Sequence, residues 1–313
     1  MAMKVLVTGG AGFIGSHIVG RLVREGHDVR VFDNLTTGKR ENLAHVANDI
    51  ELVVGDIRDD VAVGRAATGV DLVFHEAAIV SVPYSVEHPR ETHAVNVLGT
   101  LNVALAARDA GAKRLVFACS AAVYGEDPEL PKREAMRPVP VSPYGVEKIA
   151  GEQYLHAFSA IYGIETVSLR YFNVFGPRQD PTSAYSGVIS IFADRILRGA
   201  ELKVYGDGKQ TRDFVFVENV VDANMLAATT DGVSGRAYNI ACGRSTTLLE
   251  LGALLGEVSG KTPRIVHAEA RLGDVRDSVA DIALARAELR YEPRVGVRDG
   301  LAALVASLPI PPA

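Results

Sequence analysis

A short apolar strand followed by evenly spaced glycines opens the chain, in the run VLVTGGAGFIGSH. Gly9, Gly12 and Gly15 leave room for a tight turn, and Phe13 and Ile14 begin a helical pattern between the last two of them. Glycine lets the backbone approach a pyrophosphate, and the N-terminus of the following helix offers free N–H groups and a partial positive charge. These five residues therefore predict a dinucleotide-binding turn.

An acidic residue stands where such a turn needs one. Asp33 ends the next apolar run, 18 residues after Gly15. A carboxylate at about this distance accepts hydrogen bonds from the adenosine ribose, and it would repel a 2′-phosphate. The sequence therefore favours NAD over NADP. Lys39 and Arg40 point the other way, and we interpret them as a solvated helix start.

Apolar runs of strand length alternate with helical patterns through the first half of the chain. Near-continuous apolar strands separated by helices are typical of a parallel sheet covered on both faces. We predict a Rossmann-like, doubly wound α/β fold. The predicted strands are Lys4–Val7, Asp28–Phe32, Glu51–Val54, Leu72–His75 and Arg114–Ala118, and the clearest helices are Ser16–Glu25 and Val95–Ala110.

The pattern changes after about Asn173, where Gly- and Pro-rich loops and more arginines appear. The change predicts a smaller, mixed α/β lobe at the carboxyl edge of the sheet, where open α/β folds bind ligands. Arg212–Ala228 again reads as strand then helix, so we expect the chain to return to the first domain. The expected division is residues 1–172 with about 213–240 for the cofactor domain, and 173–212 with 241–313 for the lobe.

The bulk composition excludes several classes of protein. The net charge of -5 argues against a general nucleic-acid binder, whose phosphate contacts need a basic surface. Two cysteines, Cys119 and Cys242, are too few for a disulfide framework and suit a reducing compartment. The first ten residues enter a strand at once, and no apolar run approaches the ~18 residues of a membrane span. We expect a cytoplasmic protein without a signal peptide, a membrane partner or a metal site.

Three residues form a candidate catalytic group. Tyr144 and Lys148 are spaced i, i+4, so they lie on one face of the helix that follows Pro143. A cation ~5 Å from the phenol, at an effective dielectric of ~20, would lower the tyrosine pKa by about two units. Ser120 ends the fifth predicted strand, at the edge where this architecture binds ligands. The group predicts a tyrosine that accepts a proton near neutral pH.

These motifs resemble an extended short-chain dehydrogenase/reductase, specifically the NAD-dependent nucleotide-sugar epimerase/dehydratase family and its UDP-galactose 4-epimerase branch. The resemblance runs along almost the whole chain. Its segments are TGGAGFIGSH at Thr8–His17, DN at Asp33–Asn34, GDIRD at Gly55–Asp59, NVLGT at Asn96–Thr100, SAAVYG at Ser120–Gly125, SPYGVEK at Ser142–Lys148, LRYFNVFGPRQ at Leu169–Gln179, GDGKQTRDFVFV at Gly206–Val217 and RLGDVRDSVAD at Arg271–Asp281.

The resemblance implies further site residues. On the cofactor side it implies that Asp56 and Ile57 hold the adenine and that Asn96 helps to place the nicotinamide, with Asn34, Ala77 and Ala78 also in contact. On the side of the UDP-sugar it implies Arg212 and Arg271 for the diphosphate, arginine being suited to phosphate oxygens. The other implied substrate residues are Val82, Ser120, Ala121, Tyr144, Asn173, Val188, Tyr205, Asp274 and Ser278.

The residues after Ser120 bear on the reaction. The family's chemistry begins with hydride transfer from sugar C4 to NAD while the tyrosine takes the proton of the 4-OH. Family dehydratases carry Asp-Glu where this chain has Ala121 and Ala122, and family decarboxylases carry Glu at the second position. GDP-fucose synthase-like members use a cysteine after this serine, whereas Cys119 precedes it. The resemblance therefore implies C4 epimerisation of a UDP-hexose.

Several alternatives stay open. A small residue at Ser278, where members restricted to UDP-glucose and UDP-galactose carry Tyr, suggests that N-acetylated sugars also fit. Ala121 and Ala122 count against UDP-glucuronate, although Arg178 could pair with its carboxylate. A 4-keto-sugar reductase would need added reduced cofactor, and a non-catalytic NAD-sensing protein has no need of the catalytic group.

Glu76 and Val80 depart from the residues usual in the family. Glu76 stands where an apolar residue is usual in the family, and a buried carboxylate needs a partner that the sequence does not identify. Val80 replaces a lysine found in some epimerases, and His75 reads as a core strand residue. Helices around Val95–Ala110 and Tyr144–Tyr162 resemble those through which family members pair, so we expect a homodimer.

Overall fold

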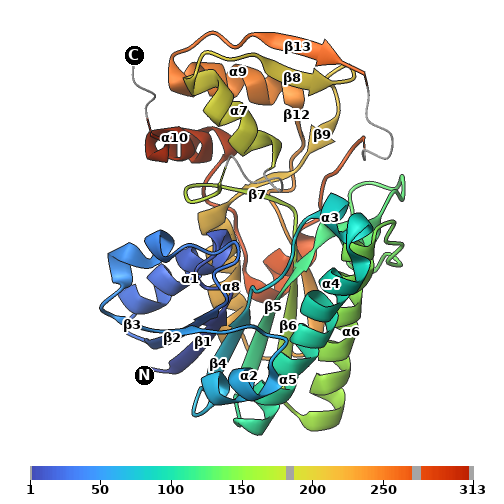
Figure 1. Ribbon diagram of the computed structural model, residues 1–313. Coiled ribbons are helices and arrows are strands. Elements are labelled where there is room, and N and C mark those ends of the chain that lie inside the picture. The colour runs from blue at the N-terminus through green and yellow to red at the C-terminus, as the bar shows by residue number, and fades with distance from the viewer. Residues whose placement is uncertain (1, 181–186, 270–275, 310–313) are drawn as a thin grey trace.

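The computed structural model describes residues 2–180, 187–269 and 276–309 (Figure 1). Within these ranges, seven parallel strands form a central sheet in the order β11-β6-β5-β4-β1-β2-β3. The strand order reverses between β1 and β4, and open α/β sheets bind ligands beyond the carboxyl ends at such a reversal. The strands are β1 (Lys4–Thr8), β2 (Asp28–Asp33), β3 (Ile50–Val54), β4 (Leu72–His75), β5 (Arg114–Ser120), β6 (Glu165–Tyr171) and β11 (Arg236–Ile240).

Helices cover both faces of this sheet (Figure 1). α1 (Phe13–Arg24) and α8 (Val217–Thr229) pack side by side on one face, and α2 (Asp60–Ala67), α5 (Thr100–Asp109) and α6 (Pro143–Tyr162) cover the other. Strands β1, β4 and β5 are buried along almost their whole length, since helices exclude water on both sides. The predicted doubly wound fold is confirmed.

The helix predicted over Val95–Ala110 differs from expectation in its first turns. Ala94–Gly99 winds as a π-helix (η2) before α5 begins. Asn96 lies in the middle of the π-turns, its side chain bonded outside the helix, and Thr100 Oγ1 donates to its carbonyl at 2.7 Å. π-Turns occur frequently at functional sites, and this one lies beside the segment that follows β4.

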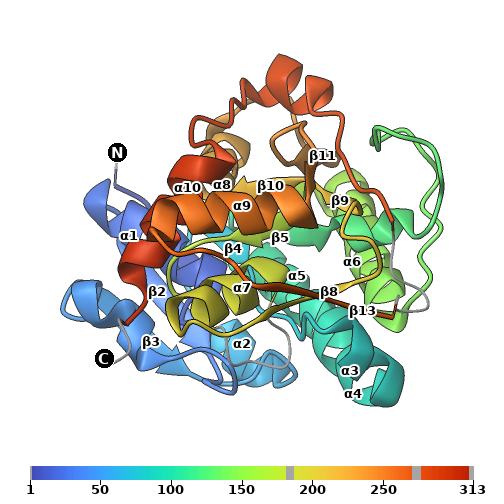
Figure 2. The ribbon, with the colours of Figure 1, turned by 90° about the horizontal axis from the view of Figure 1, so that it is seen from above.

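A second hydrophobic cluster forms a smaller lobe beyond the carboxyl ends of the strands. In Figure 2, α9 and α10 lie side by side above the sheet. The lobe is built on small strand pairs, β8 with β13 in parallel and β9 with β12 antiparallel. Its elements are α7 (Val188–Leu197), β8 (Leu202–Tyr205), β9 (Thr211–Arg212), β12 (Thr246–Thr247), α9 (Leu248–Ser259), β13 (Ile265–Ala268) and α10 (Val297–Ser307).

The strand-then-helix prediction for Arg212–Ala228 is confirmed by β10 (Phe214–Phe216) and α8. β10 does not join the large sheet, because it pairs with β7 (Asn173–Phe175). The return to the sheet is instead made by α8, which packs on β5 and β6, and by β11, which pairs with β6. The chain therefore crosses between sheet and lobe several times, and substrate-side segments from both halves meet above the strand ends. None of the described helices is long and apolar enough to cross a membrane.

Candidate active site

The glycine-rich turn joins β1 to α1 at the carboxyl edge of the sheet. Gly9 has φ of +68°, and a Cβ there would lie 2.6 Å from the backbone nitrogen of Ala77. A Cβ on Gly15 would lie 2.3 Å from the Gly9 carbonyl oxygen. Gly12 is the N-cap of α1 and provides no side chain to cap it. The first N–H groups of α1 are therefore free to bind an anion such as a pyrophosphate.

Substitution of two of these glycines separates folding from cofactor binding. We expect Gly15→Ala to cost at least about 2 kcal/mol of unfolding free energy, because its methyl group would overlap backbone. Gly12 has extended φ and ψ, and its Cβ would meet only the Gly9 oxygen, at 3.1 Å. We expect Gly12→Ala to cost less than about 1 kcal/mol while weakening NAD binding at least about tenfold. Urea unfolding and calorimetric NAD titration measure both effects, and unweakened NAD binding by Gly12→Ala would contradict this assignment.

Asp33 ends β2 next to the glycine turn. Its carboxylate accepts hydrogen bonds from the N–H groups of Ala11 at 3.0 Å and Leu35 at 2.8 Å. Burial raises its pKa, and these two bonds lower it. The carboxylate is thus fixed beside the turn, in a position that suits the ribose hydroxyls of a dinucleotide.

The remaining residues expected around the adenosine lie close to Asp33 in the chain fold. Asn34 Nδ2 donates to Asp56 Oδ2 at 3.0 Å. Arg58 donates to both oxygens of Asp56 and holds the pKa of that carboxyl well below its usual range. Ile57 is buried, next to Gly99. The Asp56 side chain is therefore occupied within the protein, and an adenine contact there stays a prediction.

Ser120, Tyr144 and Lys148 come together at the end of β5. Ser142 caps α6 by accepting from the Gly145 N–H, which starts the helix one residue before Tyr144. Tyr144 is buried and hydrogen-bonded to the Ser120 side chain. Lys148 Nζ donates to the carbonyl of Ala118 at 2.7 Å and lies 5.9 Å from the centre of the Tyr144 ring. The expected gathering of the three residues is found.

Burial has the largest effect on the pKa of Tyr144. Burial raises the pKa of the Tyr144 phenol, and the hydrogen bond from Ser120 opposes this only in part. Burial also lowers the pKa of Lys148, whose ammonium is directed at the Ala118 carbonyl. The expectation that Lys148 and the positive nicotinamide ring together lower the phenol pKa stays a prediction, and their effect has to exceed the desolvation of a buried phenol.

Asn96 is bonded to the segment that follows β4, and its expected role beside the nicotinamide stays a prediction. Its side chain accepts from the Ile79 N–H at 2.8 Å and donates to the Ile79 carbonyl at 2.9 Å. It also donates to Glu147 Oε2 at 2.7 Å, while Thr92 donates to the other oxygen of Glu147. Asn96 thus fixes the segment after β4 against α6. Glu147 was missed because its contacts join residues 51 and 55 positions apart.

Glu76, whose partner the sequence left open, is bonded to Tyr171. Tyr171 Oη donates to Glu76 Oε1 at 2.9 Å and accepts from Asn224 Nδ2 at 2.8 Å. Burial raises the pKa of Glu76 to about 7, against the lowering effects of Tyr171 and Lys148. His75 is a core residue, as expected, and bridges Thr8 and Thr100.

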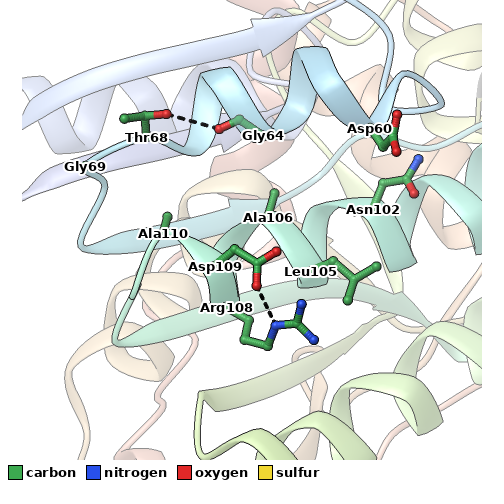
Figure 3. A pocket seen from close by; sticks show the side chains of 10 residues that line it. All are labelled: Asp60, Gly64, Thr68, Gly69, Asn102, Leu105, Ala106, Arg108, Asp109 and Ala110. Atoms are coloured by element: carbon green, nitrogen blue, oxygen red, sulfur yellow. Dashed lines mark hydrogen bonds and ion pairs between the residues drawn. The ribbon is translucent and has the colours of Figure 1, made fainter.

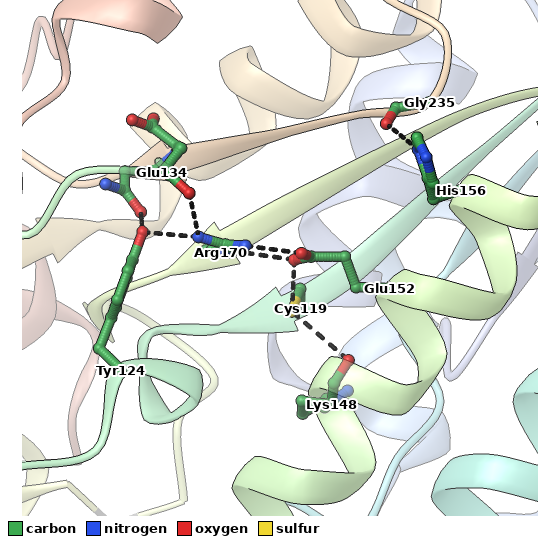
Figure 4. Close-up of polar contacts among 9 residues, drawn as sticks. Cys119, Tyr124, Glu134, Lys148, Glu152, His156, Arg170 and Gly235 are labelled. Carbon is green, nitrogen blue, oxygen red and sulfur yellow. Dashed lines mark hydrogen bonds and ion pairs between the residues drawn. The ribbon is translucent and has the colours of Figure 1, made fainter. Parts of the chain in front are cut away.

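A buried polar network lies behind Lys148 on α6 (Figure 4). Arg170 pairs with both oxygens of Glu152, at 2.9 and 2.6 Å, and also donates to Tyr124 Oη at 2.9 Å. Cys119 Sγ lies 3.4 Å from Glu152 and 3.6 Å from the Lys148 carbonyl. Burial raises the Cys119 pKa, so this thiol is an inert core group and not a nucleophile.

The same network extends to Lys132 and Asp281. Tyr124 Oη donates to Asn239 Oδ1 at 2.7 Å, and Asn239 Nδ2 donates to the carbonyls of Lys132 and Asp281. Lys132 is bridged to Ala280. Side-chain hydrogen bonds therefore connect α6 to Asp281, which lies three residues after Ser278 in the chain.

The expected substrate residues come from several elements. Arg212 in β9 donates to the carbonyls of Thr211 and Arg276, and the Ser278 N–H donates to Thr211. Arg271 and Asp274 lie outside the described residues. Of the others, Val82 begins α3 (Val82–Glu87), Ala121 begins the 3₁₀-helix η3 (Ala121–Tyr124), Asn173 begins β7, Val188 begins α7 and Tyr205 ends β8.

Asp213, which follows Arg212 in the chain, was not among the predicted site residues. Asp213 is fully buried and accepts from the N–H groups of Cys242, Gly243 and Ala280, so it fixes the backbone beside Arg212 and Ser278. No sequence pattern distinguished Asp213 from the residues around it.

Arg178 donates to Ser16 Oγ on α1 at 3.2 Å and contacts His45 at 3.3 Å. The structure therefore directs Arg178 to α1 and not to a substrate carboxylate.

A separate groove of about 510 Å³ lies between α2 and α5 (Figure 3). Its lining includes Asp60, Asn102, Arg108 and Asp109, and Arg108 is paired with Asp109 at 2.7 Å. The groove contains none of Ser120, Tyr144 and Lys148. In the described part of the chain no group of His, Cys, Asp and Glu could hold a metal ion.

The parallel sheet, the glycine turn and the serine–tyrosine–lysine group define a dinucleotide-binding protein of the short-chain dehydrogenase/reductase type. The model of the NAD dependent epimerase/dehydratase family matches residues 5–241. The chain belongs to the NAD-dependent epimerase/dehydratase family.

Relatives within the family are similar along their whole length. A UDP-glucose 4-epimerase of Mycolicibacterium smegmatis is 40% identical over 307 residues, covering 97% of both chains. The crystal structure of the Thermotoga maritima UDP-glucose 4-epimerase with UDP-glucose matches with a TM-score of 0.93 at 40% identity, over 97% of this chain and 98% of that one. A UDP-N-acetylglucosamine 4-epimerase of Methanobrevibacter ruminantium, in complex with UDP-N-acetylmuramic acid, matches with a TM-score of 0.93 at 37% identity, over 98% of both chains.

Proposed function

We propose that this protein is an NAD-dependent UDP-hexose 4-epimerase that interconverts UDP-glucose and UDP-galactose. The observation that carries the proposal is the meeting of Ser120, Tyr144 and Lys148 at the end of β5, beside a glycine-rich turn. Relatives of this length and similarity named UDP-glucose 4-epimerase support it.

The residues that would hold NAD fit the cofactor. Gly12 leaves the start of α1 uncapped and open to a pyrophosphate. Asp33 lies beside it, and among the described residues its carboxylate is bonded to backbone N–H groups and to no cation. The other cofactor residues we propose are Gly9, Phe13, Ile14, Gly15, Asn34, Asp56, Ile57, Ala77, Ala78, Asn96, Tyr144 and Lys148. Bound NAD supplies a hydride acceptor that later returns the hydride, together with a positive charge in its oxidised ring.

The chain's own groups provide the proton chemistry. Tyr144 Oη takes the proton of the sugar 4-OH as the C4 ketone forms, and returns it when the ketone is reduced on its other face. Ser120 orients Tyr144 by its hydrogen bond, and the Lys148 ammonium supplies positive charge beside the phenol. Because burial raises the phenol pKa, deprotonation of Tyr144 depends on nearby positive charge.

The substrate is anchored by its nucleotide and not by its sugar. Arg212 and Arg271 would pair with the diphosphate, with Asn173, Val188, Tyr205 and Asp274 around the nucleotide and Val82 and Ala121 near the sugar. This division lets the 4-keto sugar turn over while UDP stays bound, since binding energy is spent away from the reacting ring.

Other reactions of the family are less well supported. Ala121 and Ala122 offer no acid–base pair for dehydration or decarboxylation. The contact of Arg178 with Ser16 removes the one cation considered for a glucuronate carboxylate. Ser278 is the observation that favours a second substrate class, because a small side chain leaves room for a 2-N-acetyl group.

An NMR assay tests the proposed function. Purified protein without added cofactor is incubated separately with UDP-glucose, UDP-N-acetylglucosamine and UDP-glucuronate. We expect 4-epimers from the first two and little from the third. No conversion of any of them, even with NAD added, would contradict the proposal, and conversion only with reduced cofactor would indicate a reductase.

We further propose that the protein is a cytosolic homodimer that pairs through the outer faces of α5 and α6. Leu98, Val146 and Ile161 are between 49% and 70% exposed on or next to these helices, which is a high exposure for apolar side chains. Light scattering at micromolar concentration tests the assembly, and a monomeric mass would contradict it.

A further inference from the structure

Glu76 is the one acidic residue described at the carboxyl ends of β4, β5 and β6 that the proposed mechanism leaves without a role. It follows β4, in which His75 pairs with Phe117 of β5, so Glu76 lies beside Ala118. Its side chain nevertheless bonds to Tyr171, on the far side of β5. The Glu76 side chain therefore extends across β5, between the positions of Ala118 and Ser120.

Lys148 approaches the same place from α6. Its ammonium donates to the carbonyl of Ala118, the residue beside Glu76. Glu76 and Lys148 interact electrostatically, each favouring the charged form of the other. A buried ammonium bonded to a carbonyl needs a counter-charge, and Glu76 is, with Glu147, one of the two carboxylates that favour its charged form.

The surroundings of Glu76 contain few other charges. Tyr171 of β6 and Lys148 of α6 act on Glu76 directly. Cys119 of β5 acts on both Tyr171 and Lys148, and Glu147 of α6 acts on Lys148. α8 contributes Asn224, which is neutral and donates to Tyr171. Because Tyr171 Oη accepts from Asn224, its proton is directed to Glu76, an arrangement that suits an ionised carboxylate.

We propose that Glu76 is a positioning residue of the reaction: held by Tyr171, its carboxylate keeps the Lys148 ammonium charged, and through Lys148 it promotes proton transfer at Tyr144. The kinetic part of this inference rests on the proposed function. The electrostatic part does not, because it concerns two groups of the folded chain.

A double-mutant cycle tests the electrostatic part without turnover. Glu76→Gln, Lys148→Met and the double variant are unfolded in urea at pH 8 and pH 5. At pH 8 we expect the double variant to unfold at a higher urea concentration than the two single shifts predict when added, because the interaction is lost only once. At pH 5, where a carboxyl with a pKa of about 7 is protonated, we expect the shifts to add. Additive shifts at both pH values would overturn the proposal.

The titration of Glu76 should make the stability of the folded protein depend on pH. The pKa of Glu76 is higher in the folded protein than the ordinary value of 4.5 for a glutamate, so folding favours the protonated form. Its contribution to stability is therefore present at low pH and is lost as the pH rises from about 4.5 to 7. We expect Glu76→Gln to melt at a higher temperature, relative to the wild type, at pH 8 than at pH 5. A difference that does not depend on pH would contradict a buried, titrating Glu76.

The pH–rate profile separates positioning from structure. We expect kcat of the wild type to rise with pH through about 7, which gives the pH–rate profile an ascending limb. We expect Glu76→Gln to lack this limb and to have a kcat about tenfold lower than the wild type at pH 8. Tyr171→Phe removes the hydrogen bond that lowers the Glu76 pKa, so its limb should move to higher pH. Glu134→Gln is the matched control, because burial also raises the Glu134 pKa, but away from Lys148. An unchanged limb in Glu76→Gln would overturn the proposal, whereas absence of turnover in the wild type would refute the function and leave the cycle to decide on Glu76.

Discussion

Replacing Tyr144 by Phe will lower kcat by about three orders of magnitude, the size of effect that a positioned acid–base group provides. The substitution removes one oxygen from a ring that is 8% exposed, and the ring itself fills the same space. The phenol of Tyr171, on the strand beside Ser120, is bonded to Glu76 and Asn224, so the proton of the sugar hydroxyl loses its acceptor. We expect NAD binding by the variant to be retained.

The control for this variant is Tyr154→Phe on the same helix. Tyr154 is 41% exposed and lies outside the Ser120–Tyr144–Lys148 group, so kcat should not change. Rates by NMR and melting temperatures for both variants separate chemistry from folding. A Tyr144→Phe variant that keeps more than a tenth of the wild-type kcat would refute the role of Tyr144.

Replacing Arg170 by Met will destabilise the protein by about 3–5 kcal/mol, because it leaves the Glu152 carboxylate buried without its counter-charge. The Arg170 and Glu152 side chains are 5% and 7% exposed, so water cannot substitute for the missing guanidinium. Tyr124 and the Glu134 carbonyl lose a donor at the same time (Figure 4). Urea unfolding at pH 7 measures the loss.

Two further variants show whether the cost comes from the unpaired charge. Glu152→Leu combined with Arg170→Met removes both charges, and we expect it to recover at least about 2 kcal/mol of the loss. Arg298→Met breaks an ion pair with Glu257 whose side chains are 58% and 55% exposed, and should leave the urea midpoint of unfolding unchanged. An Arg170→Met variant as stable as the Arg298 control would contradict this account.

The parts of the molecule with local signals could be predicted from the sequence. The glycine turn, its helix and Asp33 are read from steric and electrostatic requirements of adjacent residues, and β1 and β2 lie within a residue of their predicted bounds. The i, i+4 spacing of Tyr144 and Lys148 placed both on α6 for the same reason.

What the sequence could not supply depends on contacts between distant residues. Tyr171 and Glu76 are 95 positions apart, and neither position shows that their side chains meet across β5. Pair spacing gives the effect of Lys148 on Tyr144, whereas the effect of burial on the phenol pKa requires the packed structure. The π-turns at Asn96 follow from bonds to Ile79 and Glu147 that no helical periodicity contains.

The fate of the hydrogen at sugar C4 tests the central claim, transient oxidation at C4 with the hydride kept on the protein. UDP-glucose carrying deuterium at C4 is mixed with UDP-glucose labelled uniformly with ¹³C, and the UDP-galactose formed without added cofactor is analysed by mass spectrometry. The account predicts that deuterium stays at C4 of the unlabelled-carbon product, with none on the ¹³C product and none lost to water. Loss of deuterium to solvent, its transfer between molecules, or a requirement for added reduced cofactor would contradict it.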